Sequence, residues 1–584
     1  MDSDTKNFIL FIILSFAIIF SWSLFMAPKP KHPAPGQPQA TAGAGQKPAP
    51  TETQTAPGST AAPANPPAPA PSVAPAAATV PETPAVPEKK VTVSNGVYEI
   101  VFSTRGAVPV SWQLLKYKDS VYYPYEVNLA WPPLKKIPPF QPQLVNMVNP
   151  NLASGREPFR TEIHLDNLLI PEHAAWDTDA EQLKVSDAGG AQTLSFHLQT
   201  SSGAVLTKSY TFRPDDYTVD LKLSISPSPA PGPAPKAEVL TRLSFLYESG
   251  SRLTRVNFNG PLAFAEDKLH QTKIDDLLKN KPDAQTAVTW AGFTDSYFLM
   301  ALLPAEPVQA QDWSNRYSGP EDLRQNKKAA KELSGELRVV PTAEELAQGD
   351  LLKVRLFVGP KTADLLAKVN PKLPMAIDYG MLYIVVWPLM WALNFLYKFL
   401  PNYGVCIIVL TIALRMGMFP LTRKGQQSMK EMQKLQPEMQ KIKERYPNDR
   451  MKQQEEMAAL YKKYKINPIG GCLPMLLQIP VFFAFYKALL SSIELRHAPF
   501  FGWIQDLSGR DPLLIWPLVM GGTQILMQKM TPTTSADPAQ AKMMMLMPLV
   551  FIFLLLYFPA GLIIYWTMSN LVGIGQQMYV NRQS

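Results

Sequence analysis

Arg415 is a single charged residue in an apolar segment, and its charge has to be solvated or paired. Residues 402–422 are otherwise uncharged and are long enough to cross a bilayer. A guanidinium at that depth costs at least about 2.5–3.5 kcal/mol unless water or a partner solvates it. None of the segments expected to cross the membrane contains an acidic residue. We therefore expect a hydrated pocket that accepts a negative group from outside the chain.

The alternative is an arginine that snorkels to the lipid headgroups. On a straight helix, the charged rim that begins at Arg423 lies about 12 Å from Arg415, beyond a comfortable reach for the side chain. Thr411 is placed four residues before Arg415, on the same helix face. Other spans supply polar side chains that are expected to face this pair and to hold water near it: Gln478, Tyr565 and Ser569.

The apolar segments that would position these residues predict a polytopic α-helical membrane protein. Residues 1–26 form an N-terminal anchor, because the apolar run 8–26 lacks the small-residue cleavage site of the competing reading, a signal peptide. Residues 402–584 form a core of five helices, with both termini of the chain on the cytoplasmic side. The expected spans are residues 402–422, 468–490, 512–530, 543–558 and 560–580.

Residues 372–401 are expected to form an amphipathic helix at the outer membrane interface. The stretch 379–400 is apolar enough to span, but a span there would place the loop 423–465, with its twelve basic residues, outside. The positive-inside rule argues against that arrangement. Trp387 and Trp391, one helical turn apart, are typical of an interfacial helix.

The loop 423–465 is itself predicted to be a helical hairpin. Its first limb repeats apolar residues at steps of three and four, and 447–449 (PND) breaks the run. The basic surface predicts contact with anionic phospholipids or ribosomal RNA through Arg423, Lys424, Lys430, Lys434, Lys441, Lys443 and Arg445. The alternative is that the apolar residues form only a seam between the two limbs.

Between the anchor and the core lie a linker and a large soluble domain. Residues 27–90, rich in proline and alanine, are predicted to be a disordered linker. Residues 91–371 alternate apolar and polar residues with period two, which predicts one large antiparallel β-sandwich or two fused ones. We find no catalytic or metal-binding constellation in this domain, and its histidines are scattered: His164, His173, His197 and His270. Neither a cofactor nor covalent chemistry is expected.

Four motifs in the core resemble the YidC/Oxa/Alb family of membrane-protein insertases, in its Gram-negative form. They are residues 415–422 (RMGMFPLT), 467–480 (NPIGGCLPMLLQIP), 528–534 (QKMTPTT) and 558–570 (FPAGLIIYWTMSN). The order of anchor, linker, β-domain, core and basic hairpin also fits. The chain departs from the family mildly at the paired aromatics of the last span, and its tail after residue 580 lacks a basic extension.

The resemblance implies an insertase and chaperone of the bacterial inner membrane, with a periplasmic β-domain. Such a protein inserts and helps to fold nascent membrane proteins, alone or with the Sec translocon and the ribosome, and has no DNA partner. Residues of this chain that match the groove or core-lining positions of the family are Thr411, Arg415, Gln478, Gln528, Tyr565 and Trp566. The client range and the ligand of the β-domain are not readable from the sequence.

Two other classes fit parts of the pattern. A small-solute transporter or ion channel would also use an intramembrane charge and proline-containing spans, but the two halves of the core show no inverted repeat. An intramembrane hydrolase is poorly supported, because all six histidines lie outside the expected spans. No nucleotide-binding motif of the form GxxxxGK[ST] is present either.

Overall fold

The computed structural model describes residues 78–582 apart from 80–86, 122–125, 129–134, 138–140, 153–154, 167, 201–202, 228–235, 248–256, 282, 305–309, 325, 327–328, 448, 465–472, 532–549 and 551. Residues 78–584 form one compact unit. The expected anchor 1–26, most of the linker 27–90 and half of the expected span 543–558 lie outside the described residues.

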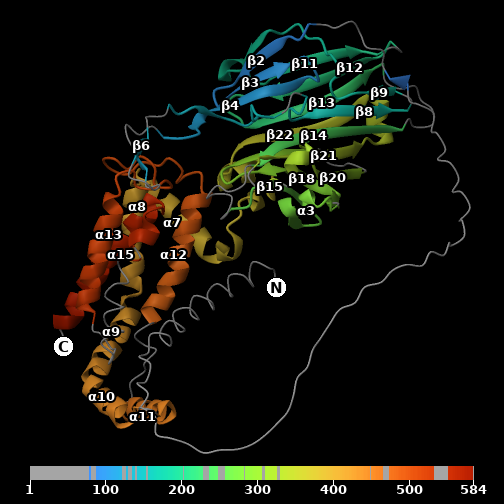
Figure 1. Cartoon of the computed structure of the whole chain (residues 1–584). Helices are drawn as coiled ribbons and strands as arrows, with labels where there is room; N and C mark the ends of the chain where they lie inside the picture. Colours follow the sequence, from blue (N-terminus) through green and yellow to red (C-terminus); the bar gives the residue numbers. More distant parts are fainter. Residues whose placement is uncertain are drawn as a thin grey trace, which may run out of the picture. The chain divides into compact units, whose positions relative to one another are not determined.

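The β-domain contains three large sheets in which nearly all neighbouring strands are antiparallel (Figure 1). The eight-stranded sheet has the order β11 (Gln192–Gln199), β12 (Val205–Phe212), β13 (Thr218–Ser226), β22 (Asp350–Pro360), β19 (Phe298–Pro304), β18 (Val288–Thr294), β15 (Gly260–Ala265) and β16 (Lys268–Gln271). The seven-stranded sheet has the order β1 (Ala78–Thr79), β9 (Leu168–Ile170), β8 (Arg160–Leu165), β14 (Ala237–Tyr247), β21 (Lys331–Val340), β20 (Ala310–Tyr317) and β17 (Asp283–Thr286).

The smaller elements complete this domain. The five-stranded sheet has the order β10 (Gln182–Lys184), β2 (Lys90–Ser94), β3 (Tyr98–Ser103), β4 (Val108–Lys118) and β7 (Leu144–Asn146). A separate pair consists of β5 (Glu126–Asn128) and β6 (Lys135–Ile137). The short helices are η1 (Asp187–Gly189), α3 (Ile274–Leu278), α4 (Glu321–Arg324), α5 (Ala343–Ala347), α6 (Ala363–Val369) and η2 (Leu373–Ala376).

The period-two pattern predicted this β-rich domain, and its β-rich character is confirmed. Residues 192–199 form β11 as expected, and all three sheets contribute to one continuous hydrophobic core. Two pairings differ from the expected antiparallel arrangement, because β1 pairs with β9 and β10 pairs with β2 in parallel. The strand β1 also lies inside the segment expected to be a disordered linker, so that the ordered domain begins earlier than the composition indicated.

Strand β12 shows how alternation builds the core and where it leaves a charge inside. Every second residue is buried, and these residues are Leu206, Lys208, Tyr210 and Phe212. The ammonium group of Lys208 donates hydrogen bonds of 3.1 Å to the carbonyl oxygens of Gly106 and Phe159. Burial lowers the pKa of Lys208 from its ordinary value of 10.5 to about 7.

The helices of the C-terminal region follow the β-domain. They are η3 (Gly380–Leu382), α7 (Tyr383–Tyr397), α8 (Tyr403–Gly417), α9 (Phe419–Lys434), α10 (Gln436–Arg445), α11 (Arg450–Lys463), α12 (Leu473–Ser491), α13 (Ile515–Met530) and α15 (Ala560–Arg582). Within the described residues, the stretch Gly380–Tyr397 alone has the length and hydropathy of a membrane span, and α8 with α9 qualifies only as a bent pair.

The prediction of one span over residues 402–422 is wrong in its continuity. Helix α8 ends at Gly417, and α9 begins at Phe419 after a bend of 60°. Pro420 stands in the first turn of α9, where its missing amide hydrogen is tolerated, whereas inside one continuous helix it would remove a hydrogen bond and clash with the preceding turn. Arg415 therefore lies in the last turn of α8, where the helix dipole favours a cation. The distance of about 12 Å along a straight helix does not apply.

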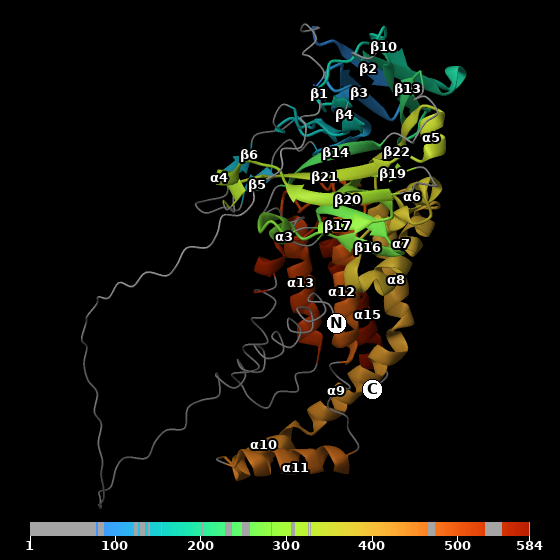
Figure 2. The ribbon, with the colours of Figure 1, turned by 90° about the vertical axis from the view of Figure 1, so that its right-hand side faces the viewer.

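The predicted hairpin forms, but its first limb is divided. Leu435 separates α9 from α10, so that three helices take the place of two. Helices α10 and α11 lie side by side (Figure 2). A small apolar cluster joins the limbs and includes Met432, Leu435, Met439, Leu460 and the partly buried Ile442. The seam that we considered as the alternative is thus present, and it leaves the basic residues on the outer surface.

The buried charge on β12 makes the stability of this domain depend on pH. Between pH 7 and about 10.5 the unfolded chain holds a proton that the folded domain has released, so the free energy of unfolding rises with pH over this range. Between pH 7 and pH 9, we expect the free energy of unfolding to rise by about 2 kcal/mol less in Lys208→Met than in wild type. Hydrogen exchange of the β11–β13 amides in denaturant measures this difference.

The matched control is Lys184→Met, which removes an exposed lysine from β10. This control should keep the pH dependence of the wild-type protein. The free energies of unfolding of Lys208→Met and wild type could instead change with pH in parallel. That result would show that the folded domain does not compensate the buried charge by releasing the proton of Lys208.

Candidate functional site

The polar cluster of the helical region is centred on Arg415. Its Nε atom donates a hydrogen bond of 2.7 Å to Oγ of Ser569 on α15. Gln576, two turns further along α15, donates a hydrogen bond of 3.0 Å to the backbone carbonyl of Arg415. Among the described residues, no carboxylate forms an ion pair with this guanidinium. The positive charge is thus solvated by neutral groups, as the absence of acidic residues in the expected spans indicated.

Helix α12 contributes the second part of the cluster through Gln478. The side-chain amide of Gln478 donates to the hydroxyl of Tyr565 and, at 3.4 Å, to Oγ of Ser569. Its Oε1 atom is buried and accepts no hydrogen bond from the described residues. Ser569 therefore stands between Arg415 and Gln478, and the amide of Gln478 keeps one unused acceptor beside a cation.

Thr411 is close to Arg415 in sequence, but its hydroxyl bonds within its own helix. Its side chain is fully buried, and its hydroxyl donates a hydrogen bond of 2.6 Å to the carbonyl of Ile407 in its own helix. A hydroxyl bonded to the carbonyl four residues earlier is a common arrangement for threonine inside a helix. In this arrangement the hydroxyl of Thr411 donates within its own helix, and the structure shows no hydrogen bond between Thr411 and the side chain of Arg415 among the described residues.

Aromatic side chains from α12 support the cluster. The ring of Tyr565 stacks on Phe485, with centroids 4.4 Å apart. Trp566 meets Phe482 edge to face, with centroids 4.9 Å apart. These contacts fix the rotation of α15 about its axis, and with it the direction in which Ser569 points.

Helix α13 joins α15 through a polar seam that the sequence analysis missed. The indole nitrogen of Trp566 donates to Oε1 of Gln524 at 3.2 Å, and Asn570 donates to the hydroxyl of Thr523 at 3.2 Å. The expected groove residue Gln528 is half-buried one turn further along α13. A signal for the seam was present, because Thr523 and Gln524 are adjacent polar residues in an otherwise apolar stretch.

The interfacial residues lie on an exposed apolar stripe of α7. Ile384, Trp387, Trp391 and Phe395 recur at steps of three and four, and all four are exposed. The opposite face of α7 packs on the helices, and Asn394 accepts a hydrogen bond of 3.0 Å from the hydroxyl of Tyr403 at the start of α8. Helix α7 is thus fixed to α8 on one face and leaves an apolar stripe exposed on the other.

The basic residues of the hairpin divide into exposed and partly covered groups. Those that are exposed are Lys424, Lys434, Lys441 and Arg445, and those that are half-buried are Arg423, Lys430 and Lys443. Lys430 donates a hydrogen bond of 3.2 Å to the carbonyl of Val580 near the end of α15. The exposed group carries its charges on the surface of the hairpin.

The described groups of the cluster can bind and solvate a polar ligand, but they are not suited to breaking a covalent bond. The cluster contains a guanidinium, two hydroxyls and an amide, and none of these is paired with a general base among the described residues. The described part of the chain also holds no group of histidine, cysteine and acidic residues that could bind a metal ion. An anionic or polar segment, or water, is the kind of ligand that these donors accommodate.

Comparison with known proteins places the chain in a family. The family model of the 60Kd inner membrane protein matches residues 395–584, and that of the YidC periplasmic domain matches residues 161–392. The membrane protein insertase YidC of Citrifermentans bemidjiense is 37% identical over 494 residues, which cover 85% of this chain and 86% of that protein. The chain belongs to the YidC family of membrane protein insertases.

A second relative of similar identity agrees with this assignment. The membrane protein insertase YidC of Syntrophus aciditrophicus is 35% identical over 510 residues, covering 85% of each chain. A crystal structure of an active YidC insertase with its first transmembrane domain resolved is 17% identical, with a TM-score of 0.35, and covers 84% of this chain and 92% of that one. The resemblance inferred from the four core motifs is confirmed, and the chain is a YidC-type inner-membrane protein with a β-rich domain.

The hydrogen bonds distinguish residues that serve the cluster from residues that only lie near it. We expect Ser569→Ala to reduce membrane insertion of a client at least fivefold, because it removes the acceptor for a charged donor. Thr411→Val should stay within about twofold of wild type, because the hydroxyl bonds only to its own helix. Insertion into vesicles containing the purified variants measures both effects.

Thr567→Val is the matched control, since the hydroxyl of Thr567 is buried and donates at 2.8 Å to the carbonyl of Ile563 in the same way. It should behave like Thr411→Val. A strong loss in Thr411→Val together with normal insertion in Thr567→Val would show that Thr411 acts on the client, against the geometry described above.

Proposed function

We propose that the polar cluster around Arg415 is the place where this insertase receives the hydrophilic segment of a nascent membrane protein. The observation that carries the proposal is the bonding of Arg415, whose guanidinium meets Ser569 but no carboxylate among the described residues. A cation solvated only by neutral groups attracts an anion strongly where the local dielectric is low. The unused acceptor of Gln478 supports the presence of water beside it.

The cluster would shorten the apolar barrier that the segment has to cross. Arg415 and Gln478, with the donors and acceptors of Ser569 and Tyr565, replace part of the water that the polar segment loses. The apolar helix of the client then partitions into lipid, at about 25 cal/mol per Å² of buried surface. This transfer drives the step, so neither a nucleotide nor a covalent intermediate is needed.

The finer architecture belongs to the same proposal. Residues 1–26 anchor the chain, residues 27–90 link the anchor to the β-domain, and residues 91–371 form that domain in the periplasm. The interfacial helix 372–401 would set the depth of α8, since it is fixed to Tyr403. The five-helix core 402–584 would expose the hairpin 423–465 and both termini to the cytoplasm.

Three further partners follow from the exposed charges and the family. The hairpin would contact anionic phospholipids and the ribosome through Lys424, Lys434, Lys441 and Arg445, which are exposed. Cooperation with the Sec translocon would place the polar cluster beside a client that leaves the channel sideways.

The charge of Arg415 should matter most for clients with an acidic translocated segment. We expect Arg415→Ala to reduce insertion of such a client at least tenfold and to leave a matched client with a neutral segment within about twofold. Arg415→Lys should keep part of the activity, because the charge survives while the planar fork of donors is lost. Reconstituted insertion of the two clients, translated in vitro, measures the ratio.

Arg582→Ala is the control, since it removes an exposed cation from the end of the same α15. Arg582→Ala should leave unchanged the ratio of insertion of the acidic client to insertion of the neutral client. Equal insertion of both clients by Arg415→Ala would remove the electrostatic part of the mechanism and leave the family assignment intact.

The hairpin is expected to act in insertion rather than to connect two helices. Replacing α10 and α11 (436–463) by a Gly-Ser linker of equal length should abolish insertion, because it removes the part of the apolar seam formed by Met439 and Leu460 together with the exposed charges of Lys441 and Arg445. The protein should still reach the membrane at normal abundance. Insertion by the replaced protein at the wild-type rate would establish that the hairpin is only a connector.

A further inference from the structure

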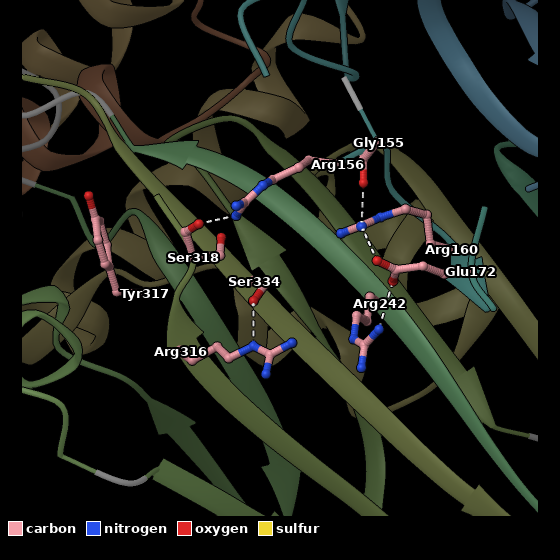
Figure 3. Close-up of a pocket in the computed structure, with 9 residues that line it drawn as sticks. All are labelled: Gly155, Arg156, Arg160, Glu172, Arg242, Arg316, Tyr317, Ser318 and Ser334. Carbon is pink, nitrogen blue, oxygen red and sulfur yellow. Dashed lines mark hydrogen bonds and ion pairs between the residues drawn. The ribbon is translucent and has the colours of Figure 1, made fainter. Parts of the chain in front are cut away.

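The β-domain contains a polar cavity that lies apart from the cluster around Arg415. The cavity has a volume of about 430 Å³ and opens on the seven-stranded sheet (Figure 3). Four arginines line it, namely Arg156, Arg160, Arg242 and Arg316, with a single carboxylate, Glu172. A volume of this size is typical of a small-molecule site.

Strand register brings two of these arginines together. Arg160 on β8 and Arg242 on β14 are direct cross-strand partners. Like charges in that position destabilise a sheet unless something compensates them. Glu172 does so, because its two carboxylate oxygens lie 2.8 Å from Nη1 of Arg160 and 2.7 Å from Nη1 of Arg242.

The remaining carboxylates stand behind the guanidinium groups and do not line the cavity. Arg242 also pairs with Glu162 at 2.9 Å and with Glu336 at 2.6 Å. Burial alone would lower the pKa of Arg242, but its hydrogen bonds to Glu172, Glu336 and Glu162 outweigh burial and raise it. Glu332 lies 3.5 Å from Arg156 and brings the number of carboxylates in the network up to the number of arginines. The excess of positive charge exists only at the wall of the cavity.

Several donors at this wall remain available. Arg316 donates through Nε to Ser334 at 3.3 Å, its Nη2 is 3.8 Å from Glu336, and 61% of its side chain is exposed. Nη2 of Arg242 has no hydrogen-bond partner among the described residues, and Oγ of Ser318 is buried without one. Arg156, whose Nη1 donates to the carbonyl of Ser318, brings a further guanidinium to the same wall.

We propose that this cavity binds a small ligand through a phosphate group. Guanidinium groups held in place by carboxylates behind them match the several oxygens of a phosphate, which accepts paired hydrogen bonds from more than one arginine. The buried hydroxyl of Ser318 supplies a further donor. The phosphate belongs either to a free organic phosphate or to a lipid headgroup, because both present the same oxygens.

Calorimetric titration of the full-length protein in a neutral detergent tests the site, with inorganic phosphate and sn-glycerol 3-phosphate as probes. We expect saturable binding of at least one probe with Kd below about 10 mM, weakened by added NaCl. Arg316→Gln should weaken it at least tenfold. This variant is chosen because Arg316 is largely exposed, whereas loss of Arg160 or Arg242 would leave Glu172 partly unpaired.

Arg338→Gln is the matched control. Arg338 lies on β21, is 43% exposed and pairs with Glu238 and Asp312, but it does not line the cavity. Its Kd should stay within about twofold of wild type. Tighter binding of sn-glycerol 3-phosphate than of inorganic phosphate would show that the site also recognises the organic group that carries the phosphate, and equal binding would show recognition of the phosphate group alone. Absence of saturable binding of both probes, or equal weakening by Arg316→Gln and Arg338→Gln, would overturn the proposal.

Discussion

The helical region is organised by the cost of keeping a guanidinium in an apolar setting without a carboxylate. Arg415 meets this cost with a hydroxyl from α15, and the amide of Gln478 on α12 shares that hydroxyl. Because Ser569 must lie between the two, the axial position and rotation of α15 are constrained. The stacking of Tyr565 on Phe485 and the edge-to-face contact of Trp566 with Phe482 hold that rotation.

The break after Gly417 gives this arrangement its depth. A straight helix would have carried Arg415 far from any polar rim, whereas the bend at Met418 places it in the last turn of α8. The helix dipole then assists the neutral donors and acceptors in stabilising the charge. The bend also starts α9, which leads directly into the hairpin, so the position of Arg415 and the direction of the hairpin are set by one feature of the backbone.

Local patterns in the sequence predicted what depends on local order. Alternation located strands such as β11, and helical spacing located the hairpin seam at Met432 and Met439. The break at Met418 also had a local signal in Pro420, whereas the length of the apolar run favoured a single span. The back-bonded hydroxyl of Thr411 had none, since a threonine on the expected face can turn either way.

The arginine cavity shows a different limit of prediction. Its lining residues lie between positions 155 and 334, and they meet only because β8, β14, β21 and β20 are neighbours in one sheet. No spacing along the chain encodes that neighbourhood. The sequence therefore indicated a β-domain without a recognisable site, while the fold gathers four guanidinium groups around one space.

The polar side of α15 has a consequence for the biogenesis of the insertase itself. This helix has 23 residues, yet it lacks the hydropathy of a candidate span, because its buried face carries Ser569, Asn570, Gln576 and Gln577. Such a helix partitions poorly into lipid by itself. Ser569, Asn570 and Gln576 find their partners on α8, α12 and α13, all of which leave the ribosome earlier. Helix α15 is therefore received by polar side chains that were synthesised before it, and its arrival completes the cluster around Arg415.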